Sequence, residues 1–233
     1  MRRFLILMVG TVLGFSLSAQ DVSGFPLEGK TVAVYFSKKQ FVFDSSFRIP
    51  LSQFILSDKG EDAPIEDIKT QTLISLGTLF SEQLQPAAQA DSVYFLNEFP
   101  AQARAFIANY DSENRTLGPT GEIFAGTDYI LVVNPFVLGS YTTSAVYTRS
   151  NRLITEKVMV KTGRVRIEIY DAAQGNRVHS TEVCIDERKT AVPDILFEFH
   201  MRSSRTGNFL ARLFSLAIFH LNYRLESNCE TVE

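Results

Sequence analysis

The sequence predicts an α/β (α+β) protein with a single mixed β-sheet and helices packed on it. In the first half, short apolar runs alternate with segments of helical periodicity, which favours parallel pairing between the strands. In the second half, two long β-prone runs flank a turn that contains Gly175, which predicts a long antiparallel hairpin. An apolar segment with helical spacing near the end of the sequence predicts a C-terminal helix.

The first half supplies two strands and two helices. Residues 31–37 form a nearly continuous apolar run, which is typical of a strand covered on both faces. The acidic, proline-containing residues 61–64 open an amphipathic helix that should end before Pro86. Residues 91–96 predict a short strand, and the alanine-rich spacing of residues 97–109 predicts a second helix.

The second half supplies a buried strand, the hairpin and the final helix. These elements cover residues 128–146, 157–170, 177–185 and 205–226. The turn between the hairpin strands places Gly175 where a positive φ is required. The connection over residues 187–204 has no assignment.

Apolar residues in the long strand change parity along its length. Val158 and Val160 fall on one parity, whereas the apolar residues from Val165 onward fall on the other. Because successive side chains of a strand point to opposite faces, such a change requires an extra residue. The sequence therefore predicts a β-bulge at Thr162 and Gly163.

Residues 38–60 interrupt this order as an insertion with two interpretations. Residues 40–43 and 53–56 are apolar enough to form two short strands, or the whole segment is one loop with aromatic anchors. A structureless loop of this length is unusual in a compact domain. We therefore expect a small hairpin-like insertion.

The first nineteen residues predict a secretory signal peptide. Arg2 and Arg3 precede an apolar run over residues 4–15, and small side chains follow up to Ala19, where we expect cleavage. The apolar run is too short to span a membrane. Residues 20–30 then form a flexible lead, residues 31–226 a single α/β domain and residues 227–233 a tail.

The charge balance argues against a nucleic-acid partner. The sequence carries 23 basic and 26 acidic side chains, whereas a dedicated nucleic-acid binder is usually basic. Positive charge gathers over residues 147–189, with nine basic and six acidic side chains. This segment is either an ordinary solvated surface or a basic face that meets an acidic partner or lipid headgroups.

The two cysteines, Cys184 and Cys229, leave two possibilities open. An exported protein enters a compartment that permits disulfides, so the pair could join the tail to a strand. Alternatively, Cys184 is a small core residue and Cys229 a separate thiol in the tail.

No motif predicts catalysis, a metal site or a cofactor. The three histidines, His179, His200 and His220, are expected to have ordinary core or surface roles, because a metal site needs three or four convergent ligands. Neither a Gly-x-Ser-x-Gly elbow nor a His-Glu-x-x-His pair occurs. We therefore expect a protein that is not an enzyme.

Three segments resemble a known group of bacterial envelope proteins. They are Val32-Ala-Val-Tyr-Phe36, Gly126-Thr-Asp-Tyr-Ile-Leu131, and residues 165–178 with Asp171-Ala-Ala-Gln-Gly175. Together they resemble the periplasmic α/β domain shared by the TolB amino-terminal domain, the curli secretion channel family and outer-membrane activators of penicillin-binding proteins. The resemblance implies a non-enzymatic binding or scaffold domain, periplasmic or outer-membrane-associated, in a Gram-negative bacterium. The sequence departs from the group in lacking a lipobox cysteine and in carrying residues 38–60.

The sequence thus predicts an accessory, assembly or regulatory factor that binds an envelope protein, with peripheral membrane contact at most. The candidate surface is the hairpin over residues 141–178, because exposed hairpin edges can accept a partner strand. Its candidate residues are Tyr141, Tyr147, Arg149, Arg152, Lys157 and Arg164. The alternatives are a small-ligand or glycan-binding module, and a hydrolase whose site is assembled from distant residues.

Overall fold

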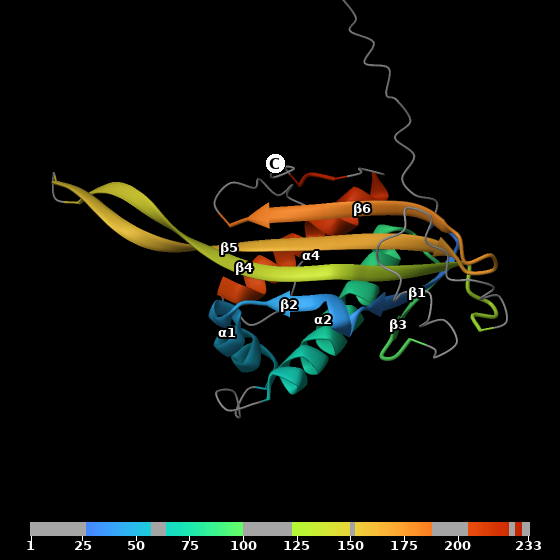
Figure 1. The fold of residues 1–233 in the computed structure, drawn as a ribbon. Helices are drawn as coiled ribbons and strands as arrows, with labels where there is room; N and C mark the ends of the chain where they lie inside the picture. The colour runs from blue at the N-terminus through green and yellow to red at the C-terminus, as the bar shows by residue number, and fades with distance from the viewer. Residues whose placement is uncertain are drawn as a thin grey trace, which may run out of the picture.

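The protein is a mixed β-sheet with helices on one face, as the sequence predicts (Figure 1). The computed structural model describes residues 27–56, 64–99, 123–149, 152–187, 205–223 and 227–229. The helices described are α1 (Ser45–Leu56), α2 (Ile65–Ala87) and α4 (Arg205–Asn222). This arrangement confirms the expected fold class, including the C-terminal helix and the long hairpin.

Parallel and antiparallel halves meet in the middle of the six-stranded sheet. Its main order is β3 (Ser92–Leu96), β1 (Thr31–Phe36), β4 (Tyr129–Arg149), β5 (Arg152–Asp171) and β6 (Arg177–Asp186). β1 is parallel to both β3 and β4, whereas β4, β5 and β6 are antiparallel. Helix α2 lies between β1 and β3 in the sequence, as a parallel crossover requires.

The segment expected to be a hairpin-like insertion is instead part of the sheet and its helical cover. It forms a 3₁₀ turn (Lys38–Gln40), then strand β2 (Phe41–Phe43), which pairs in parallel with β4, and then α1. Residues 53–56 are therefore helical and do not form a second strand. The reason is local: Phe47 and Leu51, four residues apart, lie on one helix face and are fully buried in the core.

The main core lies between the sheet and the three helices. Phe36 of β1 is at its centre, with ring centroids of Phe214, Phe80 and Phe136 at 5.7, 5.8 and 6.5 Å. Phe80 and Phe214 belong to α2 and α4, so one aromatic cluster joins both helices to β1 and β4. Burial of such rings supplies most of the driving force for folding.

A smaller cluster covers part of the opposite face of the sheet. Ala33 and Ile130 pack there with Phe99 and Phe124, which follow β3 and precede β4. Residues 97–99 are not helical, contrary to expectation, and the remainder of the expected helix over 97–109 lies outside the described residues.

The predicted bulge at Thr162 and Gly163 is wrong. The extra residue lies in β4, where Val133 and Phe136 face Ile167 and Val165, and the bond between Asn134 and Pro135 is cis. β5 pairs with β4 without interruption from Arg152 to Val165.

The apolar residues of β5 change parity because the buried face of the strand changes along its length. Val160 and Val165 are both buried, but they lie on opposite faces of an uninterrupted strand. Helix α4 covers β5 at Gly163, where an added Cβ would lie 3.0 Å from Leu213, and its first turn reaches Lys161 through Thr206. The turn after β5 is as predicted, with Gly175 at φ 71°.

We expect Phe214→Ala to lower the free energy of unfolding by about 3–5 kcal/mol, because it removes a buried ring shared by two helices and the sheet. Urea denaturation measures the change. Leu153→Ala, at a side chain that is 78% exposed, is the control and should change stability by less than about 0.5 kcal/mol. Equal effects of the two substitutions would contradict this assignment of the core.

Acid should destabilise the protein through His220. Burial lowers the pKa of this imidazole below its ordinary value of 6.5, and its Nδ1 atom has no hydrogen-bond partner among the described residues. Its contribution to stability is therefore complete above pH 6.5 and is lost as the pH falls toward the folded-state pKa, by at most about 1.4 kcal/mol per pH unit.

Urea denaturation of the wild type and of His220→Leu at pH 7.5 and 5.5 tests this expectation. The variant retains the other two histidines, so a smaller loss of stability between the two pH values isolates His220. The same loss in both proteins would show that His220 does not cause the pH dependence.

Candidate functional site

The two longest strands project beyond the rest of the sheet as a twisted hairpin, here called the arm: residues 141–149 of β4 and 152–160 of β5 (Figure 1). β2 last pairs with β4 at Leu138, and β6 last pairs with β5 at Thr162. Among the described residues, the arm strands therefore have only each other as ladder partners.

The arm sequence keeps both strands extended without a third strand beside them. Its two segments, YTTSAVYTR and RLITEKVMV, are rich in β-branched residues and contain neither glycine nor proline. A two-stranded hairpin alone is only marginally stable in water. The arm must therefore depend on the contacts that hold its root.

Three large apolar side chains lie exposed on one face of the arm. Val146, Leu153 and Met159 are 63%, 78% and 58% exposed, and the exposed Lys157 shares their face. Within the sheet body, the same face of β5 carries Val165, which is buried under the helices. The arm thus continues this face of the sheet beyond its helical cover, with three exposed apolar side chains set among threonine, serine and lysine. Exposed apolar side chains that gather on one surface can mark contacts.

Helix α1 holds one side of the arm root. Asp44, which immediately precedes α1, accepts hydrogen bonds from the Ser46 backbone N–H at 2.9 Å and from the Ser140 hydroxyl at 2.8 Å. Burial raises the pKa of the Asp44 carboxyl, but the hydrogen bonds from Ser46 and Ser140 outweigh this effect, so the pKa lies below its usual value. A charged carboxylate therefore caps α1 and fixes β4 where the arm begins.

Strand β6 and helix α4 hold the other side of the root. The Tyr141 hydroxyl donates a hydrogen bond to Asp186, the last residue of β6. The Lys161 ammonium donates to the Thr206 hydroxyl at 2.7 Å and lies 5.4 Å from the centre of the Phe47 ring. One lysine of β5 thus contacts both α4 and α1.

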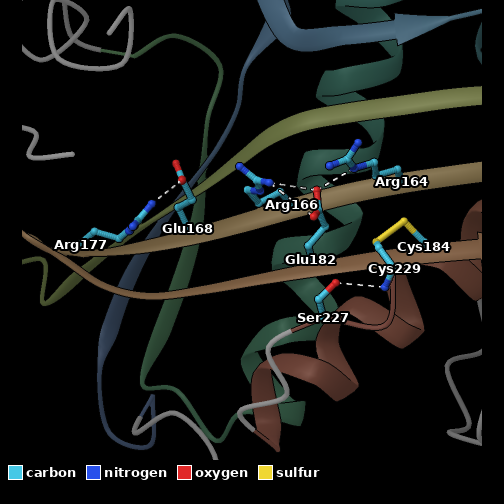
Figure 2. A network of polar contacts seen from close by, with 8 residues as sticks. All are labelled: Arg164, Arg166, Glu168, Arg177, Glu182, Cys184, Ser227 and Cys229. Atoms are coloured by element: carbon cyan, nitrogen blue, oxygen red, sulfur yellow. Dashed lines mark hydrogen bonds and ion pairs between the residues drawn. A yellow bond between two sulfur atoms is a disulfide. The ribbon is translucent and has the colours of Figure 1, made fainter. Parts of the chain in front are cut away.

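The sheet face opposite the helices carries a network of ion pairs beside the root (Figure 2). Glu182 of β6 accepts a hydrogen bond from Arg164 at 2.7 Å and lies 3.4 Å from Arg166. Burial raises the pKa of the Glu182 carboxyl, but the hydrogen bonds and charges of Arg164 and Arg166 lower it by more. The pKa therefore lies below its ordinary value of 4.5. Nearby, Arg177 pairs with Glu168 at 3.1 Å.

The structure separates the candidate residues that the sequence grouped together. Lys157 lies in the arm and Tyr141 at its root, whereas Arg164 lies in the sheet body and pairs with Glu182. The backbones of Tyr147, Arg149 and Arg152 belong to the arm, but their side chains lie outside the described part of the structure.

Sequence reasoning missed Val146, Leu153 and Met159 as surface residues. No alternation marks them in the sequence, because Val146 lies between Ala145 and Tyr147, and Met159 between Val158 and Val160. The only signal is that these segments extend past the predicted neighbouring strands. It also missed Asp44, because residues 38–60 were not recognised as a strand followed by a helix.

The described residues form neither a metal cluster nor a membrane-spanning helix. No group of three His, Cys, Asp or Glu side chains in this part of the chain is placed to hold a metal ion. The helices described are too short or too polar to cross a membrane. His179 lies on β6 and His220 is buried on α4, whereas His200 lies outside the described residues.

Comparison with known proteins gives only remote structural neighbours. No family model and no curated protein matches the chain. One similar structure is a protein described as a neuraminyllactose-binding hemagglutinin homolog from Helicobacter pylori, with 10% identity, a TM-score of 0.41, and coverage of 85% of this chain and 87% of that chain. Another is the hypothetical protein CT253 from Chlamydia trachomatis, with 10% identity, a TM-score of 0.35, and coverage of 83% and 92%. At these values neither likeness bears on the function of this chain.

We expect Glu182→Ala to lower the free energy of unfolding by about 1 kcal/mol at pH 7, because it removes the carboxylate shared by two arginines. The lowered pKa means that this contribution is complete above pH 4.5 and is lost as the pH falls below it. Urea denaturation at pH 7 and pH 3.5 should therefore show a smaller difference from wild type at the lower pH.

Glu66→Ala is the matched control. Glu66 also pairs with two lysines, but its own side chain is 66% exposed, so water screens these ion pairs. It should change stability by less than about 0.5 kcal/mol. A Glu182→Ala effect that is the same at both pH values would show that packing, and not charge, is responsible.

Proposed function

We propose that this protein is a non-enzymatic binding protein of the bacterial envelope, which attaches to a protein partner through its arm. The observation that carries the proposal is the exposure of three apolar side chains, Val146, Leu153 and Met159, on one face of a hairpin that extends beyond its neighbouring strands in the described part of the chain. Contact with a partner would remove these apolar side chains from water, which favours binding.

The arm suits strand addition by a protein partner. An extended segment can pair with the outer backbone groups of β4 or β5, and every second side chain of the segment then lies on the same side of the sheet as Val146, Leu153 and Met159. Met159 can adapt to irregular partner surfaces because its side chain is unbranched and polarizable. Lys157, on the same face, favours a partner with an acidic residue nearby.

The shape of the arm favours a protein over a small ligand. Small molecules bind in concave sites that bury most of their surface. A two-stranded ribbon presents a long, narrow surface, which matches an extended polypeptide better than a saccharide ring. The root contacts of Asp44, Tyr141 and Lys161 keep this surface in a fixed direction relative to the sheet.

The envelope location is supported by two features. Residues 1–19 have the order of a secretory signal peptide, and Cys184 is joined to Cys229 in a disulfide, a bond that persists in oxidising compartments. An assembly or regulatory role in the envelope accords with the resemblance of the sequence to envelope scaffold domains.

A photo-crosslinking amino acid at Leu153, in the protein expressed in its native host, tests the proposal. We expect one defined envelope protein to be captured, and Met159→Asp in the same protein to reduce the yield about tenfold, because a buried charge removes at least 1.4 kcal/mol of binding. Mass spectrometry identifies and quantifies the captured protein.

Val178 provides the matched control, because it is 47% exposed on β6 and lies outside the arm. A crosslinker at Val178 should not capture the same protein, and Val178→Asp should leave the Leu153 yield unchanged. Capture that is equal from Leu153 and Val178, or that survives Met159→Asp and charge reversal at Arg149 and Arg152, would rule out the arm as the binding surface.

A further inference from the structure

The C-terminal residues 227–229 lie along the outer edge of β6 (Figure 2). Ser227 forms a parallel bridge with Glu182, and the Asn228 backbone N–H donates to the Glu182 carbonyl at 3.2 Å. The next residue, Cys229, forms the disulfide with Cys184. Three consecutive residues thus occupy the position of a seventh strand, joined to β6 by a covalent bond.

Asn228 satisfies both backbone groups of Cys184. The Cys184 N–H donates to the Asn228 side-chain oxygen at 2.7 Å, and the Asn228 side-chain nitrogen donates to the Cys184 carbonyl at 2.9 Å. A neighbouring strand would satisfy the same two groups with its own backbone. The asparagine amide is therefore a substitute for strand pairing, at an edge that can accept a strand.

We propose that the edge of β6 at Glu182 and Cys184 is a second docking site, for an extended polypeptide segment that carries an asparagine followed by a cysteine. The chain's own residues 227–229 occupy this site while the disulfide is intact, and reduction of the disulfide makes the site available. The proposal goes beyond the proposed function, because it concerns the sheet edge and is independent of the arm.

The disulfide is the part of this contact that keeps the tail in place. Among the described residues, Asn228 joins the tail to β6 by three hydrogen bonds, and the net gain from each is similar to the entropy cost of ordering one residue. The covalent bond removes most of that cost by keeping the tail near the edge. Without the bond, the tail should exchange with any segment that offers the same groups.

The opening step needs a dithiol reductant. Such a reductant transfers two electrons and two protons to the bond between Cys184 and Cys229, which breaks to give two thiols, while the reductant closes its own disulfide. An incoming segment that ends in a disulfide-bonded cysteine can then form a mixed disulfide with the Cys184 thiolate, with release of the segment's former thiol partner.

Peptide tethering to the Cys229→Ser protein tests the docking site. The probe has the sequence Glu226-Ser-Asn-Cys-Glu-Thr231, and the control peptide has alanine in place of Asn228. In a thiol-exchange buffer, intact mass spectrometry measures the mixed disulfide with Cys184. We expect about tenfold more adduct with the asparagine peptide, because only that peptide can pair with both backbone groups of Cys184. Equal yields would overturn the proposal.

Hydrogen exchange of the Cys184 backbone amide tests the opening step without a substitution. In the wild-type protein, a dithiol reductant added after folding should speed exchange of this amide about tenfold or more, while the amides shared by β4 and β5 remain protected. A Cys184 amide that remains equally protected after reduction would show that the tail does not need the disulfide. That result would overturn the proposed opening even if the Cys229→Ser protein failed to fold.

Discussion

The organisation of this protein depends on two strands, β4 and β5, that are longer than the strands beside them. β4 and β5 extend for 21 and 20 residues, whereas β6 extends for 10 and β1 for 6. A sheet satisfies its backbone groups through neighbouring strands and its apolar face through the layer packed on it. Where neighbours and helices end, the extra length continues as the arm, whose strands pair only with each other among the described residues. The position of the candidate site is therefore a consequence of strand length.

The root contacts turn this extra length into an oriented surface. Asp44, Tyr141 and Lys161 connect the base of the arm to α1, β6 and α4, so each neighbouring element contributes one polar contact. These contacts lie at the level where burial in β5 changes faces, between Val160 and Val165. These contacts thereby hold the base of the arm at a fixed angle to the rest of the fold.

The sequence predicted the parts of the fold that depend on local periodicity. The strands and helices with strong apolar patterns, including the hairpin and the turn at Gly175, follow from spacing and turn chemistry alone. It did not predict α1, because Pro50 interrupts the segment and the apolar residues 53–56 were interpreted as a second short strand, whereas Phe47 and Leu51 are buried on one helix face. It placed the bulge in the wrong strand, because parity alone cannot distinguish an extra residue from a change of the covered face. Likewise, Arg164 and Lys157 look equivalent in the sequence, and only the length of β6 separates a paired arginine from a lysine on the arm.

The β6 edge and the arm differ in how far other residues cover their backbone groups. At β6, a three-residue tail, an asparagine side chain and a disulfide cover the backbone groups of Glu182 and Cys184. On the arm, a much longer stretch of strand carries Leu153 and Met159 without a covering layer among the described residues. Uncovered strands favour association with other chains, and proteins normally block them with charge, proline, bulges or cover. The arm contains no proline and no bulge, so the charges of its residues, among them Glu156 and Lys157, are the protection that its sequence supplies. The β6 edge, whose cover is held by a reducible bond in the proposal above, therefore contrasts with the arm, which no described residue covers.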